Sequence, residues 1–142
     1  MPAPQEIFAR LLAKPPAYPE LTGLQPVEVE RGRAVFIMDV GPHHANPMGT
    51  VHGGALATLA DSAMGIAYAS TLADDEAFTT LELKINFLKP VWSGRLSAVG
   101  TVVKAGRTVG LTACDVTDEA GSLVAHATST CLTLRGEMAN GR

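Results

Sequence analysis

Asp61 is the residue of this sequence best suited to do chemistry, because it is the only charged side chain between Gly53 and Ala73. The segment around it is apolar and rich in alanine and glycine. A lone carboxylate in such surroundings is costly unless it has a partner or a task. We expect Asp61 to be buried among apolar side chains, which would raise its pKa and make it a better general base near neutral pH.

The residues that lead into this segment could supply a complementary group. They read Asn46-Pro-Met-Gly-Thr-Val-His52-Gly53-Gly54. The first amides of a helix have no partner within the helix, and the helix dipole favours negative charge at that end. Glycine also lets a substrate approach the backbone closely. If a helix begins near Gly53, the amides of Gly53 and Gly54 are predicted to stabilise an oxyanion.

The spacing of these two groups carries a consequence for assembly. Gly53 and Asp61 are eight residues apart, which is about 12 Å along a helix with a rise of 1.5 Å per residue. Both therefore cannot engage one carbonyl group from the same helix. If both act on one substrate, Asp61 must come from a second subunit.

The elements that would position these residues follow from the periodicity of the chain. A short amphipathic helix over 7–12 ends at a run of prolines, and two strands flank the turn Arg31-Gly32. A helix from Gly53 to near Asp74 follows. Four strand-like segments complete the chain, at 80–87, 95–104, 108–117 and 122–134. This order predicts the α+β class, with a mainly antiparallel sheet wrapped around one long central helix.

Composition restricts the function classes. The 142 residues fit one domain over 1–142, with 1–25 as an N-terminal helix or arm and 135–142 as a flexible tail. A net charge of −3 with dispersed cations argues against nucleic acid and anionic membrane surfaces as partners. An aspartate at the centre of 55–72 would cost about 2.5–3.5 kcal/mol in a bilayer. No signal peptide is visible at the N-terminus, so we expect a cytoplasmic protein with Cys114 and Cys131 reduced.

The sequence resembles the hotdog-fold thioesterases, in particular the group of phenylacetate-pathway and Arthrobacter-type hydroxybenzoyl-CoA thioesterases. The resemblance covers about 27–134 and rests on the loop with Asn46 and Gly49, on His52-Gly53-Gly54 with Asp61 nine residues after the histidine, and on the strand Thr80-Leu-Glu-Leu-Lys-Ile-Asn-Phe87. It implies hydrolysis of a small, possibly aromatic acyl-CoA, phenylacetyl- or hydroxybenzoyl-like, and a place in phenylacetate degradation.

The resemblance also implies roles for individual residues. Asp61 would act as general base or nucleophile, Gly53 would polarise the thioester carbonyl through its N–H, and Asn46, His52 and Thr80 would orient water or substrate. The CoA moiety of the substrate could meet Gly54, Lys89, Lys104 and Arg107, although solvated turn charges explain these cations equally well. No cofactor or metal is expected, since CoA is part of the substrate. The active site would straddle the interface of a homodimer.

Apolar or small residues on both faces of 96–103 and 109–116 indicate that another subunit covers one face, so we expect a homo-oligomer. A dimer and a dimer of dimers, which would be a homotetramer, are both open at this point. Each site residue has a simpler alternative. Asp61 could bond to Thr58, Ser62 or a neighbouring backbone group, and His52 could cap the helix or bond a loop carbonyl. Gly53 and Gly54 could serve only turn geometry, Asn46 could shape its loop, and Thr80 could be an ordinary strand residue.

Other chemistries are less well supported by the sequence. His43 and His44 are adjacent and point to opposite sides of an extended chain, which disfavours a metal site with His52. No Gly-Xaa-Ser-Xaa-Gly elbow or catalytic cysteine setting is visible. The rival functions are a hotdog hydratase or dehydratase acting on acyl thioesters, and a non-catalytic acyl-CoA binding or sensor protein.

Overall fold

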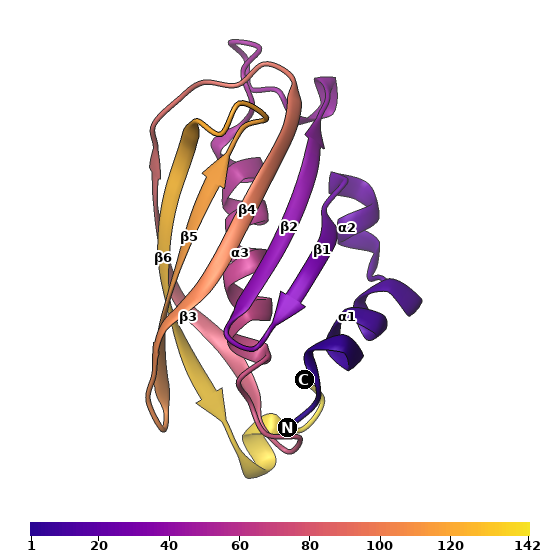
Figure 1. The fold of residues 1–142 in the computed structure, drawn as a ribbon, viewed down its shortest axis with the longest axis vertical. Coiled ribbons are helices and arrows are strands. Elements are labelled where there is room, and N and C mark those ends of the chain that lie inside the picture. The colour runs from indigo at the N-terminus through magenta and orange to yellow at the C-terminus, as the bar shows by residue number, and fades with distance from the viewer.

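A computed structural model describes residues 1–142, and it contains a six-stranded sheet with one long helix packed against it (Figure 1). The elements are, in chain order, α1 (Pro4–Ala13), α2 (Ala17–Thr22), β1 (Gln25–Glu30), β2 (Arg33–Val40), a 3₁₀ turn (Pro42–His44), α3 (Gly53–Ala69), β3 (Ala77–Phe87), β4 (Gly94–Ala105), β5 (Val109–Thr117), β6 (Leu123–Leu134) and a second 3₁₀ turn (Gly136–Ala139). The predicted α+β class, hairpin and four later strands are confirmed, with small differences at the strand ends.

The sheet is antiparallel throughout, with the strand order β1-β2-β4-β5-β6-β3. The two edges are therefore β1 and β3. Residues alternate between the two faces of the sheet, so that Leu96 and Ala98 of β4 and Cys114 and Val116 of β5 are buried. In β3, a bulge between Thr80 and Glu82 interrupts the pairing with β6.

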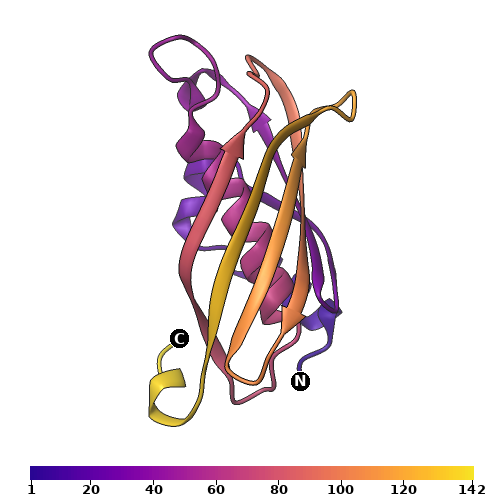
Figure 2. The ribbon, with the colours of Figure 1, turned by 90° about the vertical axis from the view of Figure 1, so that its left-hand side faces the viewer.

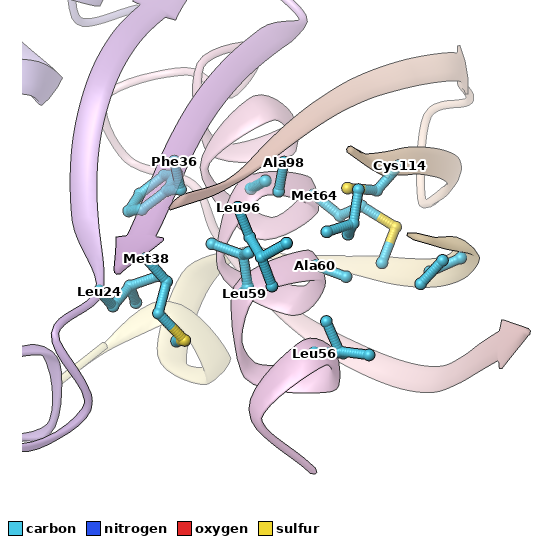
Figure 3. Packing of buried hydrophobic residues seen from close by; sticks show 14 of the residues in the cluster. Leu24, Phe36, Met38, Leu56, Leu59, Ala60, Met64, Leu96, Ala98 and Cys114 are labelled. Atoms are coloured by element: carbon cyan, nitrogen blue, oxygen red, sulfur yellow. The ribbon is translucent and has the colours of Figure 1, made fainter. Parts of the chain in front are cut away.

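The helix α3 packs on the sheet through small residues. Ala60, Ala63 and Ala67 are fully buried, and Leu56, Leu59 and Met64 belong to the same buried cluster as Phe36, Met38 and Leu96 from the strands (Figure 3). The strands curve past one side of the helix (Figure 2). The helix contacts all six strands, so the predicted sheet wrapped around one central helix is confirmed, with one side of the helix left open.

The end of α3 lies earlier than the sequence suggested. The helix ends at Ala69 and not near Asp74, because two hydroxyls close its last turn. Ser70 Oγ donates to the Ala67 carbonyl at 2.6 Å and accepts from the Gly32 amide at 2.7 Å, and Thr71 Oγ1 donates to the Tyr68 carbonyl at 2.7 Å. None of the helices combines the length and the apolar content that a bilayer crossing requires.

The N-terminal arm contains a second helix that the proline run concealed. Pro16 occupies the N-cap position of α2 and Pro19 lies in its first turn, where proline is tolerated. Neither α1 nor α2 buries a residue completely, although Ile7, Phe8 and Leu11 pack partly against the core. At the other end, Arg135 forms an ion pair with Glu76, and the tail 135–142 includes the second 3₁₀ turn.

We predict that Gly100→Ala destabilises the fold by about 3 kcal/mol. A Cβ at Gly100 would lie 2.4 Å from the backbone of Ala63, and neither backbone can move aside cheaply. Gly65→Ala is the matched comparison, because its Cβ would meet only the Phe78 ring, at 3.3 Å, and should cost less than about 1 kcal/mol. Chemical denaturation measures both. Equal stability of Gly100→Ala and the wild type would contradict the close packing of α3 on β4.

Candidate active site

Asp61 lies on the side of α3 that the sheet does not cover. A residue next to Ala60 is turned about 100° from it around the helix, which takes Asp61 away from the buried row of Ala60, Ala63 and Ala67. Asp61 is exposed in the single chain, so the expected burial is wrong. The apolar sequence of α3 does not reveal that the rest of the chain leaves one side of the helix uncovered.

The carboxylate of Asp61 has no hydrogen-bond or ion-pair partner, and its pKa is nevertheless raised above the usual value. The cause is the protein on one side of the group, which removes water from the charged form. The direction of the predicted pKa shift is confirmed. The structural alternative is not supported, because the Thr58 hydroxyl is bonded to Tyr18 at 2.7 Å and Ser62 makes no bond to Asp61.

A cavity of about 800 Å³ opens beside this carboxylate. Asp61 and Thr80 lie on its wall, which brings together two of the residues that the sequence singled out. The remaining walls are largely apolar and come from the arm, from β1 and β2, and from α3 and β3, with Leu11, Leu24, Phe36, Ile66 and Phe78 among them. The cavity suits an apolar group held next to a carboxylate.

The start of α3 presents one free amide rather than two. His52 caps the helix, and its Nδ1 accepts from the Gly54 N–H at 2.8 Å. The amide of Gly53 has no hydrogen-bond partner in the chain. The prediction of an available helix amide therefore holds for Gly53, while the Gly54 amide is occupied by the cap. Because Nδ1 of His52 accepts, its Nε2 carries the proton in the neutral ring and can donate.

Phe87 is a site residue that the sequence reasoning missed. Its ring lies directly against Gly53, where a Cβ would come within 2.8 Å of the ring. The side chain is 55% exposed although it faces the helix, so it forms a wall beside the free amide. Its inward position in the alternating strand 80–87 was the available signal.

Asn46 shapes its own loop in this chain. Its Oδ1 accepts from the amides of Met48 at 3.0 Å and Thr50 at 3.2 Å, and its Nδ2 donates to Thr50 Oγ1 at 2.8 Å. This is the loop-capping alternative, which an asparagine before Pro47 already offered. The structure does not place Asn46 on the cavity of Asp61.

The three candidate cations are not brought together. Lys89 follows β3 and forms an ion pair with Asp118 at 2.5 Å. Lys104 is exposed near the end of β4, and Arg107 is exposed in the turn between β4 and β5. That turn is close to the end of α3, since Gly110 packs against Tyr68, whereas Gly53 and Gly54 begin the helix. One chain therefore does not join these cations into a single phosphate site.

The remaining candidate groups are hydrogen-bonded or buried within the fold. Both ring nitrogens of His44 are bonded, Nδ1 to the Gly41 amide and Nε2 to the Thr22 carbonyl. Burial raises the pKa of the Cys114 thiol to about 12 and also raises that of Cys131. A thiol that stays protonated is a poor nucleophile. Asp61, by contrast, has both a free lone pair and a cavity beside it.

Comparison with known proteins places these features in a family. Residues 48–125 match the model of the Thioesterase superfamily. The chain is 30% identical over 105 residues to the 1,4-dihydroxy-2-naphthoyl-CoA hydrolase of Listeria monocytogenes, covering 74% of this chain and 85% of that protein.

Solved structures agree with this match. The conserved protein PA5202 from Pseudomonas aeruginosa is 37% identical with a TM-score of 0.80, over 84% of this chain and 94% of that one. The E. coli PaaI protein, from the phenylacetic acid degradation operon, shares the fold at 24% identity with a TM-score of 0.85, over 95% of this chain and 98% of that one.

The matched segment runs from the loop before α3 through β3, β4 and β5 into β6, and it includes His52, Gly53, Asp61 and Thr80. The chain therefore belongs to the Thioesterase superfamily of hotdog-fold thioester hydrolases.

Proposed function

We propose that this protein is an acyl-CoA thioesterase that hydrolyses a small apolar acyl-CoA, aromatic as in phenylacetyl- or hydroxybenzoyl-like groups, to the free acid and CoA. The observation that carries the proposal is the unpartnered Asp61 carboxylate, which has a raised pKa and lies on the wall of a largely apolar cavity. In this proposal the acyl group enters the cavity and Asp61 activates water or attacks the thioester carbon directly.

The oxyanion that forms on the carbonyl needs a donor. The free Gly53 amide at the N-terminus of α3 is suited to that task, because its N–H and the helix dipole both favour negative charge. We assign His52 Nε2 a supporting role as a donor toward the substrate or water, and Thr80 a contact on the cavity wall. Phe87 would shield the Gly53 amide from bulk water.

In this proposal the Asp61 carboxylate and the Gly53 amide that act on one thioester come from two different subunits. Gly53 and Asp61 are about 12 Å apart along α3. The edge strand β3 borders the cavity through Phe78 and Thr80, and it exposes Leu81 (56%) and Phe87. An uncovered edge with apolar side chains favours pairing with another chain. We propose a homodimer in which each Asp61 serves the thioester held at the partner's Gly53.

A second contact would build the tetramer. The outer face of β4 and β5 exposes Val103, Val109 and Leu111, which supports a dimer of dimers.

The aromatic substrate and a place in phenylacetate degradation rest on the relatives: one is named for a dihydroxynaphthoyl-CoA and another comes from a phenylacetic acid operon.

Thiol release from a panel of acyl-CoAs tests this function. The panel holds phenylacetyl-, hydroxybenzoyl-, short-chain and long-chain acyl-CoAs, and the expected result is hydrolysis with a preference for the aryl substrates. Absence of thiol release across the whole panel would overturn the proposal in favour of a non-catalytic acyl-CoA binding protein.

We predict that Asp61→Asn lowers kcat/KM by roughly 10²–10⁴-fold, because the amide keeps the shape of the carboxylate but cannot accept a proton. The matched control is Asp75→Asn, an exposed carboxylate in the loop before β3, which should leave the rate unchanged. The wild-type rate should fall at acid pH as Asp61 is protonated, with a midpoint above the ordinary pKa of an aspartate. An Asp61→Asn variant as active as the wild type would remove Asp61 from the mechanism.

We predict that Gly53→Pro lowers kcat about 10²–10³-fold relative to Gly53→Ala. Proline at the first helical position is tolerated but lacks the N–H, and His52, with ψ 137°, already has the conformation that precedes proline. Both variants displace the Phe87 ring, so their difference isolates the amide. Equal kcat values for the two variants would show that the Gly53 N–H does not stabilise the oxyanion.

The shared site predicts complementation between inactive chains. A heterodimer of one Asp61→Asn chain and one Gly53→Pro chain contains one site with both defects and one intact site. Purified through two different affinity tags, it should recover about half of the wild-type activity. Heterodimers that are as inactive as the parent homodimers would mean that the two residues do not act across the interface.

A further inference from the structure

Two cavities follow one another along the uncovered side of α3. The larger one, of about 800 Å³, lies beside Asp61, Gly65 and Ile66. The smaller one, of about 410 Å³, lies beside His52, Gly54 and Thr58, in the first turns of the helix. Tyr18 of α2 is the one residue that lines both. Its side chain therefore stands at the boundary between the two spaces.

Tyr18 is held at this boundary by one hydrogen bond to the helix. Its hydroxyl bonds to Thr58 Oγ1 at 2.7 Å, three residues before Asp61. The side chain is 54% exposed, and α2 has no fully buried residue. The end of α2 is fixed separately, because His44 Nε2 bonds to the Thr22 carbonyl at 2.6 Å. The Tyr18 ring thus forms cavity wall rather than core.

Apolar surface makes up most of the lining of both cavities. Leu11, Phe36 and Phe78 line the larger one, and Leu21, Ala45 and Ala55 line the smaller one beside the imidazole and hydroxyl groups of His52 and Thr58. An apolar acyl chain that passed the boundary would therefore still find apolar contacts. Tyr18 suits the boundary, because its ring is apolar and its hydroxyl is satisfied by Thr58.

We propose that Tyr18 is the specificity-determining residue that limits the size of the acyl group, by closing the larger cavity where it meets the smaller one. The inference rests on the proposed acyl-CoA thioesterase activity and names what sets its substrate range. Removing the ring joins the two spaces along α3 and makes room for a longer acyl chain. Tyr18 acts on substrate choice and takes no part in the proton transfers.

The test compares kcat/KM for hexanoyl-CoA and dodecanoyl-CoA in the wild type and three variants. In Tyr18→Ala the dodecanoyl-to-hexanoyl ratio should rise about tenfold or more, since each methylene accommodated in an apolar pocket can contribute that much. Thr58→Val, which removes the anchor and leaves the ring, should raise the ratio by less. Met138→Ala, a change at a 63% exposed residue of the second 3₁₀ turn that lines neither cavity, should leave the ratio unchanged.

Binding of dodecanoate, followed by calorimetry, gives a readout that does not depend on catalysis. Tyr18→Ala should bind dodecanoate about tenfold more tightly than the wild type, with hexanoate affinity unchanged. An unaltered ratio in an active Tyr18→Ala variant would overturn the role of Tyr18 and leave the thioesterase function standing. If the wild type hydrolyses no acyl-CoA, the thioesterase proposal fails, and unchanged dodecanoate binding in Tyr18→Ala would then reject the boundary role as well.

Discussion

The close packing of α3 against the backbone of β4 is the constraint on which the rest of the structure depends. Gly100 leaves room for the Ala63 backbone at a distance where no Cβ fits. The buried alanines Ala60, Ala63 and Ala67 complete this contact. Such packing fixes both the height of the helix above the sheet and its rotation about its own axis, because interiors are close-packed and resist small shifts. Every side chain on α3 has its direction set by this one contact.

The direction of Asp61 follows from that rotation. With the alanine row against the sheet, Thr58, Asp61 and Gly65 are turned toward the arm and the edge strand β3, and there they border the two cavities. The same rigid helix also separates Asp61 from Gly53 by a fixed rise. A straight helix cannot bend to bring its own amide and carboxylate together. Two copies of the chain can place the Gly53 amide of one beside the Asp61 carboxylate of the other, so the proposed function requires an assembly of subunits.

The sequence predicted the features that depend on local pattern. The alternation of apolar and polar residues predicted the strands. The lone carboxylate and the His-Gly-Gly segment before it indicated Asp61 and Gly53 as candidate site residues. Features that depend on contacts between distant residues were not predictable. The end of α3 depends on Ser70 meeting Gly32, the occupied Gly54 amide depends on the orientation of the His52 ring, and the pairing of Lys89 depends on Asp118. The helix α2 was concealed because prolines at the start of a helix look like helix breakers in sequence.

The ionisation of Asp61 affects the stability of the folded chain. Its pKa is raised in the folded chain, so the folded state binds a proton more readily than the unfolded state does. Stability therefore falls as the pH rises from the ordinary aspartate pKa through the raised value, and above that value the ionised group destabilises the fold. A partner for the carboxylate would remove this cost, and Thr58 and Ser62 are near enough in sequence to serve. Thr58 bonds to Tyr18 instead, which leaves the Asp61 carboxylate free to accept a proton.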